Sequence, residues 1–321
     1  MDLPILSCRL NAMSSRPDLW NGSLDTVDRI RRAATTDGIG AVDINYPQHV
    51  DGINAADLKA VMVETGLAVG AINLRYDGYF SLGAFTNPDP KIRREAIDLT
   101  IEAGNLALEL GAQHLIVWPA HDGYDYPFQV DYRKLHTHSV EGFSAVGDSL
   151  PELLVSLEYK PIEPRRFYAA SDIGTSMLVV RDVDLPNVGV ALDFAHSLMA
   201  GENPAQAAAL ALAEDRLFGI HLNDGYSRAD DGLVTGSIHT LSTLELLYVL
   251  QQGGYKGHIY FDTFPINEDP VKEAHANVLA VRKLWHRASE IDGTELRNAR
   301  ERHDALQILD LVHPAMDRDK A

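Results

Sequence analysis

The segment Leu157-Glu158-Tyr159-Lys160-Pro161-Ile162-Glu163-Pro164-Arg165 closes a short apolar run and places two acids and a lysine where a strand is expected to end. The interior of a strand excludes Glu and Lys unless they are paired or bound to something. In an α/β barrel, by contrast, the C-terminal ends of the strands carry the chemistry. The segment therefore favours an α/β barrel, with Glu158 as a metal ligand and Lys160 as a substrate contact.

The size and charge of the chain narrow the class of protein. Its 321 residues, 45% of them hydrophobic, can bury a sizeable core and suit one barrel of about 250 residues with an extension. The 46 acids against 28 lysines and arginines give a net charge of -18, which repels nucleic-acid backbones and anionic membranes alike. We therefore expect neither nucleic acid nor a membrane as a partner.

Two further features indicate the compartment. Cys8 stands alone, so no intrachain disulfide forms and nothing suggests an oxidising environment. The chain begins without a basic segment followed by an apolar core, and no apolar run approaches the roughly 20 residues of a membrane span. We expect a soluble cytoplasmic protein.

Short apolar or β-branched runs alternate with longer segments of helical period, which is the pattern of repeated βα units around a parallel sheet. The pattern predicts a (β/α)8 TIM barrel. Its eight strands are expected near residues 3–9, 39–46, 68–75, 113–119, 153–160, 187–194, 216–223 and 257–263.

One helix is predicted with its ends. Between the third and fourth strands, apolar residues from Ile92 to Leu110 recur at steps of four and three, which gives one apolar face. Asp89 can cap this helix, Pro90 suits its first turn and Gly111 suits its exit.

Residues 1–290 are predicted to form the barrel, and residues 291–321 a short C-terminal helical arm. The segment 293–313 carries apolar residues among many charges, so it reads as a polar helical arm. Two interpretations stay open: the arm packs on another subunit, or it lies on its own barrel.

Four polar residues fall at the ends of adjacent predicted strands. Because neighbouring strands of a closed barrel converge above the sheet, these side chains could surround one divalent cation. Oxygen-rich ligation with one nitrogen favours Mg²⁺, Mn²⁺ or Co²⁺, and Zn²⁺ is a further option. The alternative is that each acid caps a helix or pairs with a base. The four residues are Glu158, Asp193, His221 and Asp262.

Between residues 68 and 312 several motifs resemble, in the same order, those of xylose isomerases and of the wider group of xylose isomerase-like barrels that includes sugar epimerases. The first is similar to that family's E-P-K-P-N-E-P-R. The motifs are residues 158–165 (EYKPIEPR), 189–201 (GVALDFAHSLMAG), 217–223 (LFGIHLN), 230–236 (DDGLVTG) and 261–265 (FDTFP).

The resemblance implies a first metal site made of the four strand-end residues, with His221 where xylose isomerases have Asp. It also implies a second metal held by His196 with Asp230 or Asp231, and Asp193 as the bridge. The loop departs from the family pattern here, because Gly232 occupies the place of one family carboxylate. A single-metal enzyme, as in related epimerases, is therefore an open alternative.

The resemblance also implies roles in sugar binding. Lys160 matches the lysine that polarises the carbonyl of the open-chain sugar, and Trp118 matches a tryptophan that walls the pocket. Asn45 occupies the position nearest to that of the strand-two histidine that opens the sugar ring in the family. Phe264 occupies the position of a family lysine. His121 is a candidate acid or base beside Trp118.

The resulting prediction is a metal-dependent aldose–ketose isomerase, with Glu158, Lys160 and Asp262 as its catalytic residues. It acts on a small or unphosphorylated sugar and uses Mn²⁺ or Mg²⁺. The alternative is a ketose 3-epimerase or a related metal-dependent enzyme on oxidised sugars. A barrel endonuclease needs a basic DNA face, which the charge opposes. The resemblance further implies a homotetramer or, because the arm is short, a homodimer.

Overall fold

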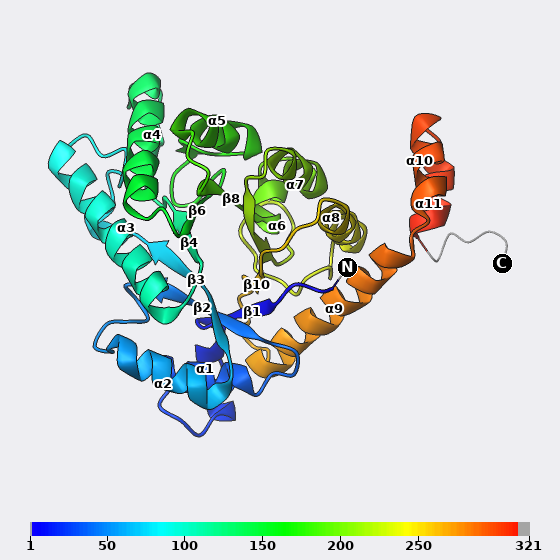
Figure 1. The fold of residues 1–321 in the computed structure, drawn as a ribbon, viewed down its shortest axis with the longest axis horizontal. Coiled ribbons are helices and arrows are strands. Elements are labelled where there is room, and N and C mark those ends of the chain that lie inside the picture. Colours follow the sequence, from blue (N-terminus) through cyan, green and yellow to red (C-terminus); the bar gives the residue numbers. More distant parts are fainter. Residues whose placement is uncertain (1, 314–321) are drawn as a thin grey trace.

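The computed structural model describes residues 2–313 and shows a closed barrel of eight parallel strands. The strands neighbour one another in the order β1-β10-β9-β8-β6-β4-β3-β2, and the ring is visible in Figure 1. All eight predicted strands are confirmed. Their bounds are β1 (Leu6–Arg9), β2 (Ala41–Tyr46), β3 (Ala68–Arg75), β4 (His114–Trp118), β6 (Leu154–Glu158), β8 (Val188–Asp193), β9 (Leu217–Leu222) and β10 (Ile259–Phe261).

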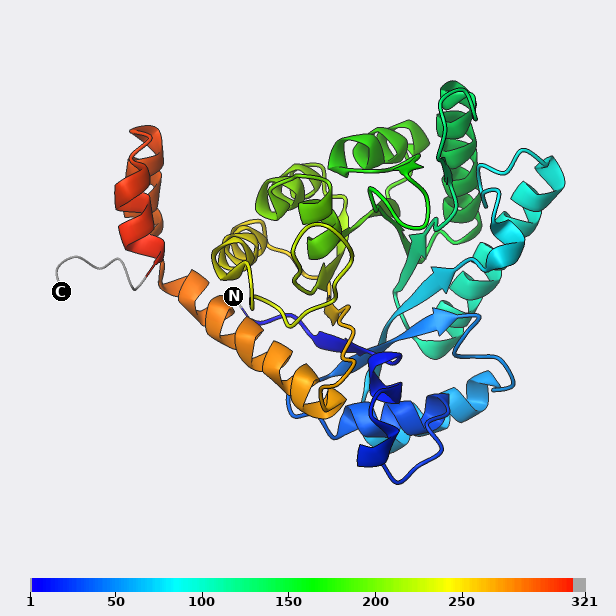
Figure 2. The same ribbon diagram turned by 180° about the vertical axis from the view of Figure 1, so that it is seen from behind.

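Helices cover the outside of the barrel in an outer layer, which both views in Figures 1 and 2 show. No helix within residues 2–313 combines the length and apolar character that crossing a membrane requires. The covering helices are α1 (Thr26–Ala34), α2 (Ala55–Thr65), α3 (Pro90–Leu110), α4 (Tyr132–Ser149), α5 (Ile173–Val183), α7 (Pro204–Ala213), α8 (Thr240–Gln252) and α9 (Pro270–Glu290), with the short α6 (Phe194–Met199), η1 (Ala12–Ser14), η2 (Pro17–Leu19) and η3 (Gly78–Phe80) in connections.

Helix α3 begins and ends where the sequence pattern predicts. The Asp89 side chain accepts a hydrogen bond from the Lys91 backbone N–H, and Pro90 occupies the first turn. Gly111 ends the helix in the left-handed conformation, with φ of 77°.

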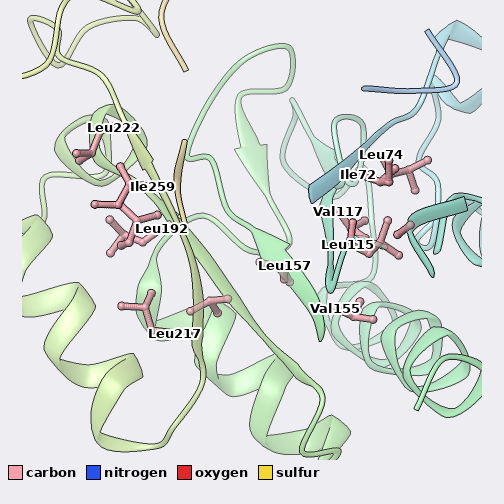
Figure 3. Close-up of a cluster of buried hydrophobic side chains, with 14 of the residues drawn as sticks. Ile72, Leu74, Leu115, Val117, Val155, Leu157, Leu192, Leu217, Leu222 and Ile259 are labelled. Atoms are coloured by element: carbon pink, nitrogen blue, oxygen red, sulfur yellow. The ribbon is translucent and has the colours of Figure 1, made fainter. Parts of the chain in front are cut away.

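Alternate residues of each strand face opposite sides of the barrel wall. In β4, Leu115 and Val117 belong to the main apolar cluster between the sheet and the helices, to which residues of β3, β6, β8, β9 and β10 also contribute (Figure 3). Ile116, which lies between them, packs instead with Ala71 and Ala191 in a small separate cluster. This two-residue period leaves one face of every strand free to carry polar groups into the barrel.

A two-stranded ribbon that the sequence analysis did not predict joins the loops after β4 and β6. Its strands β5 (Gly123–Tyr124) and β7 (Phe167–Tyr168) pair antiparallel, and the Arg165 guanidinium binds Asp125 at 2.6 Å. Next to it, the buried Asp122 carboxylate accepts three backbone N–H groups of residues 84–86. These contacts hold the loops beyond Trp118 and Lys160 in place.

The expected arm is helical but divided. Helices α10 (Gly293–Glu301) and α11 (Ala305–Val312) stand at the end of α9 (Figure 1), and the turn at 302–304 separates them. Leu296 of α10 is buried with Leu244 and Tyr248 of α8, so part of the arm lies on its own barrel. Contact with another subunit stays a prediction, and residues 314–321 of the expected arm lie outside the described residues.

Candidate metal and sugar site

The C-terminal ends of the barrel strands surround a cavity of about 280 Å³. Polar groups from seven of the eight strands or from the segments that follow them reach it, as expected from the inward faces of a barrel. Its walls are formed by Arg9, Asn45, Asn73, Leu74, Arg75, Trp118, Glu158, Lys160, Glu163, His196, His221, Asp230, Tyr260, Asp262 and Phe264.

The four predicted metal ligands meet at one side of this cavity. Glu158 ends β6, Asp193 ends β8, His221 lies in β9, and Asp262 directly follows β10. One ligand atom from each lies within 4.8 Å of the others. Asp262 is partly exposed and the other three are buried.

Asp193 is held from several directions. Its carboxylate accepts hydrogen bonds from the Asn223 amide at 3.1 and 3.3 Å and from the backbone N–H of His196 at 2.9 Å. Asn223 is oriented in turn, because its Oδ1 accepts the Ala195 N–H at 2.9 Å. The Asp193 side chain therefore has a fixed direction before any ligand binds.

This group of side chains fits a divalent cation. Three carboxylates and one imidazole are ligands that Mg²⁺, Mn²⁺, Co²⁺ and Zn²⁺ accept. Both ring nitrogens of His221 are buried without a hydrogen-bond partner among residues 2–313, although Nδ1 lies 3.4 Å from the Glu158 carboxylate. Burying a polar atom without a partner costs free energy of folding. A bond to a metal ion would satisfy one of the two ring nitrogens of His221.

Arg9 is part of the site and was not predicted. Its guanidinium lies 2.7 Å from the Asp262 carboxylate and 4.2 Å above the Phe264 ring. Burial opposes its charge, but Asp262, with smaller contributions from Tyr260 and Asp230, raises the pKa of Arg9. The signal was available, because Arg9 is a charged residue at a predicted strand end, as Glu158 is.

A second cluster lies beside the first and joins His196, Asp230 and Lys160. The Asp230 Oδ2 atom lies 3.2 Å from His196 Nε2 and 2.9 Å from Lys160 Nζ. The other ring nitrogen of His196 lies 2.9 Å from the Tyr159 carbonyl oxygen. Burial opposes the imidazolium, but Asp193 and Asp230 raise the pKa of His196 to about 9. His196 is therefore positioned as a double donor.

Asp231 does not join this cluster. Its carboxylate accepts the Tyr226 backbone N–H at 2.7 Å, and it is absent from the cavity wall. Gly232 explains the change in the loop, since a Cβ atom there would lie only 2.3 Å from the Phe264 ring. Gly232 and Phe264, the two residues that differ from the family motifs, therefore pack against each other and depend on one another.

Lys160 and Trp118 face each other in the cavity. The ammonium lies 5.5 Å from the centre of the Trp118 ring and 3.4 Å from Glu163. Burial opposes the charge of Lys160, but Asp230 raises its pKa, so the side chain stays protonated at neutral pH.

Of the remaining predicted site residues, one lies at the cavity and one does not. Asn45 lines the cavity, whereas His121 does not. His49, three residues beyond the end of β2, is buried with Nδ1 at 3.0 Å from the Asn45 backbone nitrogen and Nε2 at 2.8 Å from Asn11. Burial lowers the pKa of His49 to about 3. His49 is therefore a neutral structural residue.

Comparison with known proteins agrees with this architecture. A family model described as a xylose isomerase-like TIM barrel matches residues 30–283. The xylose isomerase of Thermus thermophilus is 34% identical over 231 residues, which are 70% of this chain and 59% of that protein. The xylose isomerase of Thermus caldophilus is 31% identical over 219 residues, or 66% and 57% of the two chains. The chain thus spans less than two thirds of these relatives.

Solved structures share the fold at lower identity. A D-allulose 3-epimerase from a Methylomonas species superposes with a TM-score of 0.68 at 19% identity, covering 88% of this chain and 99% of that one. A xylose isomerase domain protein from Alicyclobacillus acidocaldarius gives a TM-score of 0.67 at 18% identity, covering 90% and 100%.

Substitution of Glu158 tests the metal site. We expect the chelator-treated protein to bind one Mn²⁺ in a calorimetric titration, and Glu158→Gln to weaken this binding at least about tenfold because it removes a charged ligand. Glu163→Gln is the matched control, since it makes the same chemical change in the same cavity outside the ligand group. Equal losses in the two variants, or no Mn²⁺ binding by the unaltered protein, would contradict the assignment.

The metal-free protein should become less stable as the pH rises above neutral. Burial disfavours a charged His221, but Glu158, Asp262 and Asp193 together outweigh it and raise the pKa of His221 from 6.5 to about 9. The stabilisation is full below pH 6.5 and is lost as the pH approaches 9. Urea titrations of metal-free protein at pH 7, 8 and 9 should show this fall in unfolding free energy. The His221→Gln variant should show a shallower fall; a steeper or equal one would refute the explanation.

Proposed function

Since the chain belongs to the xylose isomerase-like TIM barrel family, we propose that it is a divalent-metal-dependent aldose–ketose isomerase acting on a small or unphosphorylated sugar. The observation that carries the proposal is the position of Lys160. Its ammonium lines the same cavity as Glu158, His221 and Asp262 of the ligand group. A carbonyl oxygen between them would meet positive charge from the lysine and from the metal site.

Glu158, Asp193, His221 and Asp262 would hold Mn²⁺ or Mg²⁺, with Co²⁺ and Zn²⁺ as alternatives. The bound ion supplies a Lewis acid and a template for two neighbouring substrate oxygens. Asn223 and Arg9 keep two of the ligands in place, through Asp193 and Asp262 respectively.

Lys160 would donate a hydrogen bond to the carbonyl oxygen as negative charge develops on it. Asp230 and Glu163 hold the ammonium at 2.9 and 3.4 Å, and the Trp118 ring lies 5.5 Å from it. A donor that is oriented beforehand needs no reorganisation during the reaction. Trp118 also offers an apolar face to the C–H groups of the sugar.

We further propose that a proton, rather than a hydride, moves between the first two carbons. A hydride shift calls for a second ion near His196 and Asp230. However, Asp230 already binds Lys160 and His196, and the Asp231 carboxylate points elsewhere. The Oδ1 atom of Asp230 is buried, and no group in the described part of the chain forms a hydrogen bond with it. We assign this carboxylate oxygen to take the proton from one carbon and return it to the other. The hydroxyl proton of the substrate passes from its second oxygen to its first, so that the carbonyl group changes carbon.

A ketose 3-epimerase is the second candidate function. Among the described residues, one group of acids and histidines satisfies the geometry of a metal site, which suits a single-metal enzyme. Glu158 and Asp262 would then exchange the proton at opposite faces of C3. Against this role, Asp262 is engaged by Arg9 at 2.7 Å.

An activity screen tests the proposal. The Mn²⁺- or Mg²⁺-loaded protein should interconvert at least one aldose and ketose of four to six carbons, and Lys160→Met should lower kcat by about 10²- to 10³-fold, as loss of an oxyanion donor does. Lys59→Met, on the outer helix α2, is the matched control. A ketose product from a ketose substrate would indicate the epimerase, and full kcat in Lys160→Met would contradict the role of the lysine.

The route of the hydrogen can be read from solvent label. Isomerisation in D₂O should place deuterium on the product carbon, because a proton held by Asp230 exchanges with solvent. Mass spectrometry of the product gives the label. An unlabelled product would rule out the proton route in favour of a hydride shift, while leaving the isomerase assignment intact.

A further inference from the structure

Arg75 is the one cation of the cavity wall that has no acidic partner within residues 2–313. It ends β3, is exposed, and stacks 5.7 Å from the centre of the Trp118 ring. The other cations of the wall have acidic partners. Arg9 binds Asp262 at 2.7 Å and Lys160 binds Asp230 at 2.9 Å. His196 lies 3.2 Å from Asp230, and His221 lies 3.4 Å from Glu158.

The acid nearest to Arg75 in sequence, Asp77, binds a backbone N–H group instead of Arg75. Asp77, two residues beyond it, accepts the Tyr79 backbone N–H at 2.9 Å and starts η3. No ion pair joins Asp77 to Arg75 in the described part of the chain. The positive charge of Arg75 therefore faces the cavity without a neutralising group.

Arg75 lies across the barrel from the metal ligands. In the closed ring, β3 is four strands from β9 in either direction, so Arg75 stands opposite His221. Asn73 lies two residues earlier on the same face of β3, and its Oδ1 atom is buried with no hydrogen-bond partner among the described residues. On the neighbouring strand, the Trp118 Nε1 atom is likewise buried without a partner.

We propose that the natural substrate is a sugar acid, and that Arg75 binds its carboxylate at the end of the molecule remote from the metal ligands. This inference rests on the proposed function of the same cavity, because it assumes that the reacting carbons lie at Lys160 and the metal site. Asn73 accepts a hydrogen bond from a substrate hydroxyl, and the Trp118 indole N–H donates one.

The chemistry of the wall favours a carboxylate over a phosphate. A guanidinium presents two parallel N–H groups that match a planar carboxylate. Phosphate sites in proteins commonly add a helix N-terminus or a nest of backbone N–H groups to the side-chain charge. The described cavity wall offers Arg75 alone at this end, with Asn73 and Trp118 as neutral neighbours.

Three sugars that differ only at C6 test the proposal: D-glucose, D-glucuronate and D-glucose 6-phosphate. Each is titrated calorimetrically into the Mn²⁺-loaded protein, the Arg75→Gln variant and an Arg94→Gln control, which removes an exposed arginine on α3. We expect D-glucuronate to bind about tenfold or more tightly than D-glucose, as a charge-assisted hydrogen-bond pair provides. Arg75→Gln should abolish this preference, whereas Arg94→Gln should keep it.

The outcomes separate this inference from the proposed function. Equal affinity for the three sugars, or a preference that survives Arg75→Gln, overturns the inference even if neutral sugars are isomerised. A preference for D-glucose 6-phosphate that depends on Arg75 also overturns it and assigns a phosphate instead. If the unaltered protein neither binds Mn²⁺ nor isomerises any sugar, the proposed function itself is contradicted.

Discussion

Three carboxylates packed against one buried imidazole are the constraint on which the site depends. Glu158, Asp193 and Asp262 would repel one another strongly in this largely buried site unless positively charged groups lay among them. In the metal-free protein this charge comes from protonated His221 and His196 and from Arg9, since the acids raise the pKa of each. A divalent cation would replace the proton on His221 and serve the same electrostatic purpose.

The residues packed around Asp262 explain how the site departs from the family pattern. Arg9 reaches Asp262 from the first strand and rests on Phe264, and Phe264 in turn needs a residue without a side chain at Gly232. The carboxylate that the resemblance to xylose isomerases implies at this position has no room beside that ring. One change in packing thus removes an acid from the second cluster and leaves Lys160 and His196 to share Asp230.

Much of the fold was predictable because it depends on local pattern. Eight short apolar runs became eight strands, and Asp89, Pro90 and Gly111 ended α3 where their backbone preferences require. The ribbon of β5 and β7 escaped prediction, since two-residue strands have no periodicity to detect. The arm was predicted as helical, but its division at 302–304 was not.

The sequence by itself determined the barrel and the residues that end its strands, because strand period and chain order dictate which side chains reach the C-terminal rim. Only the tertiary structure decided which of them meet. Arg9 and Asp262 are 253 residues apart and touch because barrel closure pairs β1 with β10. Asp230 and Asp231 are adjacent in sequence, yet the loop sends one to Lys160 and the other to Tyr226. Within residues 2–313 Arg75 has no acidic partner, because the same closure places it across the cavity from the metal ligands.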